Sequence, residues 1–128
     1  MVAYLSQGWL DLLKGSTGDL PERTGASARV QHVVTGTPDG EVRYVQSWSD
    51  GRLVESRLGG DPAADVTFLQ TYADAQPVAR GEVAAEVTFM QGRLKVTGDM
   101  GKVMALMPVL TSDEYRSLVA EVSHQTEY

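Results

Sequence analysis

The side chains best suited to acid–base or metal chemistry are scarce in this sequence of 128 residues, which contains two histidines and no cysteine. Without cysteine there is no thiolate metal site, cysteine nucleophile or disulfide. His32 lies among valines in a stretch typical of a strand, which favours a half-buried or edge histidine over a general base. His124 lies in a polar terminal stretch. The histidines therefore predict no catalytic site.

The acidic residues fit structural roles better than chemical ones. Glu114 follows Thr111 by three residues, so Thr111 to Glu114 has the pattern of a capping box at the start of a helix. Asp61, Asp65 and Asp74 lack the spacing of a metal-binding loop. The sequence has no Gly-x-Ser-x-Gly, His-Glu-x-x-His or phosphate-loop motif. We therefore expect no enzymatic activity, no metal and no cofactor.

The glycine-rich turn from Gly98 to Gly101 precedes an expected helix. A helix N-terminus can hold an anion, and Lys95 and Lys102 lie nearby in the sequence. Asp99, however, suits the role of a helix cap and would repel an anion. A plain capped turn is therefore the favoured interpretation.

A methionine-rich apolar segment remains as the most distinctive feature of the chain. Met100, Val103, Met104 and Met107 follow one another at the spacing of one helical face, and Met90 lies shortly before them. Methionine is flexible and polarizable, which suits surfaces that accept varied apolar shapes. Ordinary gap-filling in a packed core is the alternative explanation for this segment.

The pattern of apolar residues predicts strands first and helices later, within a single domain spanning residues 1–128. Strands are expected at 28–35, 41–49, 52–58, 65–69 and 93–97, and the dipeptide Asp50-Gly51 predicts a hairpin turn. Helices are expected at 4–14, from 70 or 71 to about 80, at 82–90, from 100 to Pro108, and after Thr111. Residues 123–128 are expected to fray. This order indicates an α+β fold, with a five-stranded, mainly antiparallel sheet covered on one face by helices. Short connections favour a meander for the first four strands.

Residues 89–106, FMQGRLKVTGDMGKVMAL, resemble the signature segment of the sterol carrier protein 2 (SCP2) family. A helix ending in phenylalanine, a Gly-Arg-Leu-Lys-Val strand, a Gly-Asp-Met turn and a methionine-rich helix follow in the family's order. The opening Tyr-Leu-Ser-x-x-Trp-Leu is similar to stand-alone bacterial members, and Ala-Asp-Val-Thr-Phe at 64–68 also resembles the family. The end of the chain lacks the peroxisomal Ser-Lys-Leu tail.

The resemblance implies a sheet and helices enclosing an apolar tunnel, with non-catalytic binding and transfer of a fatty acid, fatty acyl-CoA, sterol or other lipid. Arg93, Lys95 or Lys102 would meet a carboxylate at its mouth, and Gly98 and Gly101 are candidate hinges for opening. The residues expected to line the cavity are Tyr44, Trp48, Phe68, Tyr72, Phe89, Met90, Met100, Val103, Met104 and Met107. The same residue types can also fill a solid core. The alternative function is a protein-interaction or dimerisation module with a vestigial cavity.

Charge and hydropathy limit the partners and the location. The net charge is −6, and no basic stripe stands out, so nucleic acid is not an expected partner. The same charge disfavours strong docking on anionic membranes and leaves only transient contact. No apolar run approaches about 20 residues, and the N-terminus lacks the basic region of a signal peptide. We therefore expect a cytoplasmic protein, either monomeric or a homodimer.

Overall fold

A mixed five-stranded sheet forms the centre of the computed structural model, which describes residues 1–128 apart from the side chain of residue 19. Its strands are β2 (Ala28–Thr37), β3 (Gly40–Ser49), β4 (Arg52–Leu58), β5 (Val66–Thr71) and β6 (Lys95–Gly98). They lie side by side in the order β4-β3-β2-β5-β6, so β2 is central. All neighbours are antiparallel except β2 and β5. The expected fold class, α+β with a mainly antiparallel sheet, is confirmed.

The hairpin between β3 and β4 follows from its two turn residues. Asp50 and Gly51 both have left-handed backbone conformations, with φ of 49° and 85°. Two consecutive left-handed residues form the tight turn whose twist matches that of paired strands, and Asp-Gly is a preferred pair for it. The predicted turn is therefore confirmed.

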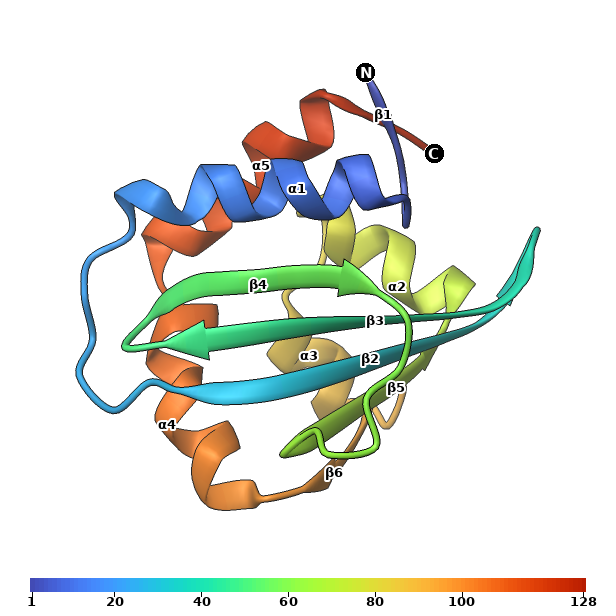
Figure 1. Cartoon of the computed structure of the whole chain (residues 1–128). Coiled ribbons are helices and arrows are strands. Elements are labelled where there is room, and N and C mark those ends of the chain that lie inside the picture. Colours follow the sequence, from blue (N-terminus) through green and yellow to red (C-terminus); the bar gives the residue numbers. More distant parts are fainter.

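The fourth strand departs from the predicted meander. Instead of pairing with β4, β5 lies on the other side of β2 and runs parallel to it. Residues 59–65 carry the chain across the sheet, where Gly59 N–H donates to the Arg43 carbonyl and Asp61 N–H to the Gln31 side chain. In Figure 1 this connection passes in front of the sheet, while α2, α3 and α4 lie behind it. The prediction of a simple meander was wrong because a short connection can also cross a sheet face.

Five α-helices accompany the sheet: α1 (Gln7–Ser16), α2 (Tyr72–Ala79), α3 (Ala85–Met90), α4 (Met100–Leu110) and α5 (Asp113–His124). A 3-10 turn, Thr17–Asp19, follows α1. Helix α1 lies along the β4 edge, and the Gln7 amide bonds to the backbone of Ser56 and Leu58 there. Helices α2 and α4 pack on β2 and β5.

The ends of three helices differ in detail from the sequence-based expectation. The side chain of Ser112, not Thr111, caps α5 by accepting from Tyr115 N–H at 3.2 Å. Helix α3 begins at Ala85 rather than at 82, and α4 continues past Pro108 to Leu110. Asp99 caps α4 as expected, accepting from Lys102 N–H at 3.2 Å.

The two ends of the chain pair with each other, contrary to the expected fraying of residues 123–128. Strand β1 (Val2–Ala3) runs parallel to β7 (Thr126–Glu127). Thr126 is buried, and its hydroxyl donates to the Val122 carbonyl. Aromatic contacts of Tyr4 with Tyr128, at 5.0 Å between ring centroids, add to this junction. The fraying prediction was wrong because these contacts are nonlocal and leave no signal in a polar terminal sequence.

The hydrophobic core lies between one sheet face and the helices. Alternate residues of β2, namely Ala28, Val30 and Val34, are buried on this face. They meet Leu10 of α1, Leu106 of α4 and Val122 of α5, among others. Within the described residues, no helix is long and apolar enough to cross a membrane.

Candidate functional site

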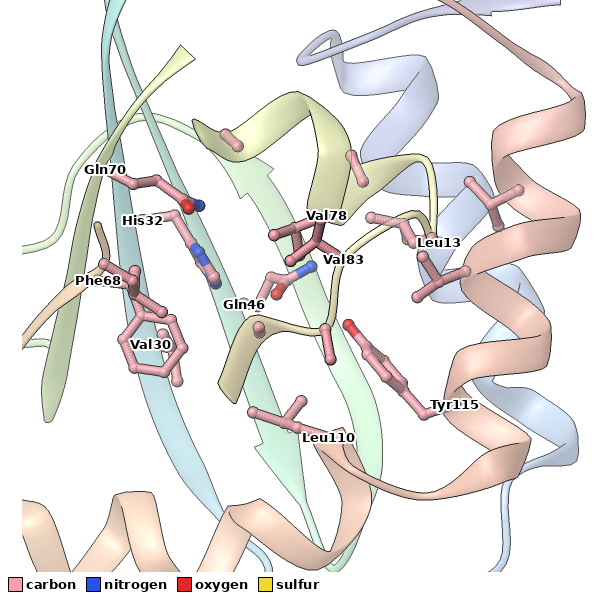
Figure 2. Close-up of a pocket in the computed structure, with 18 of the residues that line it drawn as sticks. Leu13, Val30, His32, Gln46, Phe68, Gln70, Val78, Val83, Leu110 and Tyr115 are labelled. Carbon is pink, nitrogen blue, oxygen red and sulfur yellow. The ribbon is translucent and has the colours of Figure 1, made fainter. Parts of the chain in front are cut away.

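A partly enclosed cavity of about 310 Å³ lies between the sheet and the helices. Strands β2, β3 and β5 supply one wall, and helices α1, α2, α4 and α5 supply most of the rest, together with residues 81–86. Figure 2 shows side chains from all these elements converging on the same space. Most of the lining is apolar, including Leu13, Val30, Val78, Leu110 and Val119. This lining is typical of a site for an apolar ligand.

A row of three rings crosses the sheet wall of the cavity. His32 of β2 pairs with Tyr44 of β3 on one side and with Phe68 of β5 on the other. The imidazole stacks on the Tyr44 ring with centroids 4.4 Å apart and planes 6° from parallel. The Phe68 ring meets it edge-on at 5.2 Å. Because directly opposed residues share a sheet face, the register itself brings the three rings together.

Polar side chains interrupt this apolar wall at three positions: His32, Gln46 and Gln70. All three point into the cavity in Figure 2, as does the hydroxyl of Tyr115 from α5. The Nδ1 atom of His32 and the Oε1 atom of Gln70 are buried and have no hydrogen-bond partner in the described part of the chain. The wall therefore carries unused hydrogen-bonding capacity.

Burial controls the protonation of the ionisable groups in this wall. Loss of hydration lowers the pKa of His32 to about 4, although a hydrogen bond with the Gln46 side chain acts in the opposite direction. Burial raises the pKa of Tyr115 to about 12. At neutral pH the imidazole is therefore uncharged and the phenol is protonated. Both groups then offer hydrogen bonds without net charge.

The segment of residues 81–86, here called the covering segment, lines one side of the cavity. All six residues contribute to the lining, and residues 81–83 are exposed to solvent. Glu86 in this segment forms an ion pair with Arg116 of α5, with Nη2 and Oε1 2.7 Å apart. Arg116 and Glu82 also line the cavity. The charged groups of the lining therefore gather at the covering segment and not on the sheet wall.

Three of the ten residues predicted to line the cavity are in its wall: Tyr44, Trp48 and Phe68. The structure places the other seven outside the lining: Tyr72, Phe89, Met90, Met100, Val103, Met104 and Met107. Met90 and Met104 are 83% and 69% exposed, whereas Val103 is buried. Contact of any of the ten with a ligand stays a prediction.

The basic residues considered for a carboxylate lie away from the cavity. Arg93, Lys95 and Lys102 are not in its lining, and Lys102 Nζ is 3.1 Å from Asp65 Oδ1. Hydrogen bonding from the Arg29 backbone N–H, together with Lys102, lowers the pKa of Asp65 against a smaller opposing effect of burial. Among the described residues, no three histidine or acidic side chains gather as a possible metal site.

Several lining residues were not predicted from the sequence. Among them, Gln46 could have been predicted from strand periodicity. It alternates in step with Tyr44 and Trp48, so strand periodicity places it on the same face as two predicted residues. His32 was expected to be a half-buried or edge histidine rather than a general base, and it was not assigned to the cavity wall. The covering segment lies largely within the helix expected at 82–90, but its backbone is irregular up to residue 84, and that pattern did not mark these residues as cavity lining.

Comparison with known proteins places the fold in a wider group. A family profile described as the SCP-2 sterol transfer family matches residues 10–111. No curated protein matches the sequence. The crystal structure of sterol carrier protein 2 is similar, with a TM-score of 0.70 and 17% identity, over 94% of this chain and 97% of that one.

Two further solved structures share the fold. One is a conserved hypothetical protein of Thermus thermophilus, named as possibly a sterol carrier protein, with a TM-score of 0.67, 16% identity, and 96% and 92% of the two chains covered. The other is palmitated SCP2L2 from Aedes aegypti, with a TM-score of 0.64, 15% identity, and 83% and 94% covered. At these identities the likeness shows the fold alone.

Proposed function

Because this chain belongs to the SCP-2 sterol transfer family, we propose that it binds and carries an apolar ligand in the cavity between sheet and helices. The candidate ligands are a fatty acid, a fatty acyl-CoA, a sterol or a similar lipid. The cavity is the observation that supports this function, since its volume of about 310 Å³ lies within the range of small-molecule sites. In this proposal the protein is a carrier and performs no chemical step on the ligand.

Desolvation supplies the binding energy in this proposal. Each methylene moved from water into an apolar site contributes roughly 0.8 kcal/mol, so ten contribute roughly 8 kcal/mol before ordering costs. A Kd of about 1 μM needs about 8 kcal/mol of net free energy, so a longer hydrocarbon chain must also offset the ordering costs. The lining needs no strong charge for such affinity, in keeping with the concentration of its charged residues at the covering segment.

We also place the carrier in the cytoplasm, with only transient contact to membranes. The net charge of −6 supports this view, because anionic bilayer surfaces repel an acidic protein. Ligand would then enter and leave by displacement of the covering segment.

Titration of the delipidated protein with a fluorescent fatty acid tests the function directly. We expect saturable one-to-one binding that unlabelled fatty acids, acyl-CoA or sterols displace. Val78→Trp on α2 should weaken binding at least about tenfold, because Val78 points into the cavity in Figure 2 and a larger side chain occupies ligand space. Ala73→Trp on the same helix is the matched control, since Ala73 is exposed and outside the lining.

The two variants also separate cavity binding from surface adsorption. Equal loss of affinity in both variants, or no loss in either, would show that the probe binds elsewhere. Absence of saturable binding to a folded wild-type protein would overturn the proposed function.

A further inference from the structure

Two polar groups of the cavity wall lack the partners that buried polar groups normally have. His32 Nδ1 and Gln70 Oε1 are both buried and unbonded within the described residues. A buried polar atom without a partner costs about 1–3 kcal/mol, so native proteins retain few of them. A partner that arrives with the ligand would remove this cost.

The sheet register places the two groups next to each other. Val34 of β2 pairs with Gln70 of β5, and His32 precedes Val34 by two residues on the same face. His32 and Gln70 are therefore diagonal neighbours, a separation that long side chains can span. In Figure 2 the Gln70 amide lies beside the imidazole, and both point into the cavity.

Aromatic neighbours hold the His32 imidazole in the cavity wall, but small side-chain rotations can still redirect the polar atoms of His32 and Gln70. Tyr44 stacks on one face of the ring, and the Phe68 edge contacts it from the other strand. Rotation about the last torsion of histidine or glutamine is soft, so small turns can direct either group at a ligand atom. Movement of the ring into solvent would break the aromatic contacts.

The charges around the pair favour a neutral ligand group over a carboxylate. The charged members of the described lining are Glu82, Glu86 and Arg116, and Arg116 is already paired with Glu86. The low pKa of His32 keeps the imidazole uncharged at neutral pH. The Gln70 Oε1 atom needs a donor, which an ionised carboxylate cannot supply.

We propose that His32 and Gln70 form a polar subsite for a hydroxyl group carried on the hydrocarbon skeleton of the ligand. The hydroxyl donates to Gln70 Oε1 and accepts from the N–H of the His32 imidazole, so one group satisfies both positions. The inference rests on the proposed carrier function and specifies the ligand class as hydroxylated hydrocarbons. Two sources share this chemistry, a hydroxylated acyl chain and a sterol.

Matched ligand pairs distinguish the hydroxyl from the hydrocarbon. Hexadecanoate is compared with a positional series of monohydroxyhexadecanoates, and cholesterol with its 3-deoxy analogue, each by displacement of a fluorescent fatty acid. We expect at least one hydroxylated compound to bind about five- to tenfold more tightly than its deoxy partner, as for a neutral hydrogen bond in a buried site. The series that shows the preference identifies the source of the hydroxyl.

Three variants connect the preference to the subsite. Gln70→Met and His32→Phe keep side chains of similar size and should abolish the preference, so that each variant binds a hydroxylated compound no more tightly than its deoxy partner. Val119→Ala removes apolar contact from the α5 side of the cavity, away from His32 and Gln70, and should weaken hydroxylated and deoxy ligands equally. Circular dichroism verifies folding, and Gln70→Met alone carries the test if His32→Phe does not fold.

The outcomes separate the subsite from the carrier function. Binding of the deoxy compounds without any preference for hydroxyl, or a preference that survives in Gln70→Met, overturns the subsite and leaves the carrier function intact. Failure of all compounds to bind the folded protein overturns both.

Discussion

The Arg116 guanidinium lies 2.7 Å from the Glu86 carboxylate and so joins helix α5 to the covering segment of the cavity. The Arg116 side chain is 56% exposed and that of Glu86 29%, so water screens the pair. Exposed pairs of this kind contribute about 0–1 kcal/mol. The contribution of such a pair to the free energy of unfolding is small. If the covering segment opens by breaking only this contact, however, the whole of that energy adds to the barrier to opening.

Arg116→Ala should therefore accelerate ligand release about two- to fivefold while lowering the free energy of unfolding by less than about 1 kcal/mol. Stopped-flow displacement of a fluorescent fatty acid measures the release rate. Arg43→Ala is the matched control, since it removes an exposed pair with Glu41 that lies outside the cavity lining. Equal acceleration in both variants would contradict a role for the Arg116 contact.

Substitutions on α4 should show which of its two apolar faces contacts the ligand. Leu110→Trp should weaken ligand binding at least about tenfold, because Leu110 points into the cavity. Met104→Trp should leave affinity within about twofold, because Met104 is exposed and outside the lining. Titration of both variants measures the difference. A large loss in Met104→Trp alone would indicate that the ligand binds on the outer face of α4.

Helix α4 also shows which structural features could be predicted from the sequence and which could not. Nearly every residue from Met100 to Leu110 is apolar, so the helical period fits two faces equally well. The methionine face was predicted to point inward, whereas Leu106 and Leu110 line the cavity. The helix itself was predictable from its pattern and its Asp99 cap. Its rotation depends on packing against β2 and β5, which no local pattern encodes.

The sheet shows the same division between local and nonlocal information. Alternation and turn residues predicted the strands and the β3–β4 hairpin, because both are local properties. The parallel pairing of β5 with β2 depends on a seven-residue crossing from 59 to 65 and was missed. That pairing places Phe68 and Gln70 beside His32, so the position of the β5 residues in the cavity wall could not be derived from the sequence.

Gly98 at the end of β6 occupies a position that only glycine fits. Its φ is 115°, and a Cβ atom there would overlap the backbone oxygen of Asp65. Gly98→Ala should lower the free energy of unfolding by about 2–5 kcal/mol, since backbone strain and overpacking add. Urea denaturation measures this loss. Gly15→Ala is the contrasting control, because Gly15 is exposed in α1 with nothing near its Cβ position. That control should leave stability unchanged or raise it by up to about 1 kcal/mol.

The buried imidazole of His32 predicts a specific dependence of stability on pH. Its pKa is about 4 in the folded protein, below the ordinary value of 6.5, so the unfolded chain binds more protons between these values. Stability is then complete above about pH 6.5 and falls as the pH drops to about 4. The loss is roughly 3 kcal/mol, because a pKa difference of one corresponds to about 1.36 kcal/mol. Below pH 4 this group contributes no further change.

Urea denaturation at pH 7.5, 5.5 and 4.5 measures the effect of His32. His32→Phe should remove the loss between pH 6.5 and 4, because the variant has no proton to gain there. Asp65→Asn should keep that loss and instead remove a contribution at lower pH, since the Asp65 carboxyl has a pKa lowered from 3.8 and loses its partners on protonation. Equal pH dependence of wild type and His32→Phe between pH 7.5 and 4.5 would show that the imidazole titrates normally and reaches water in the folded protein.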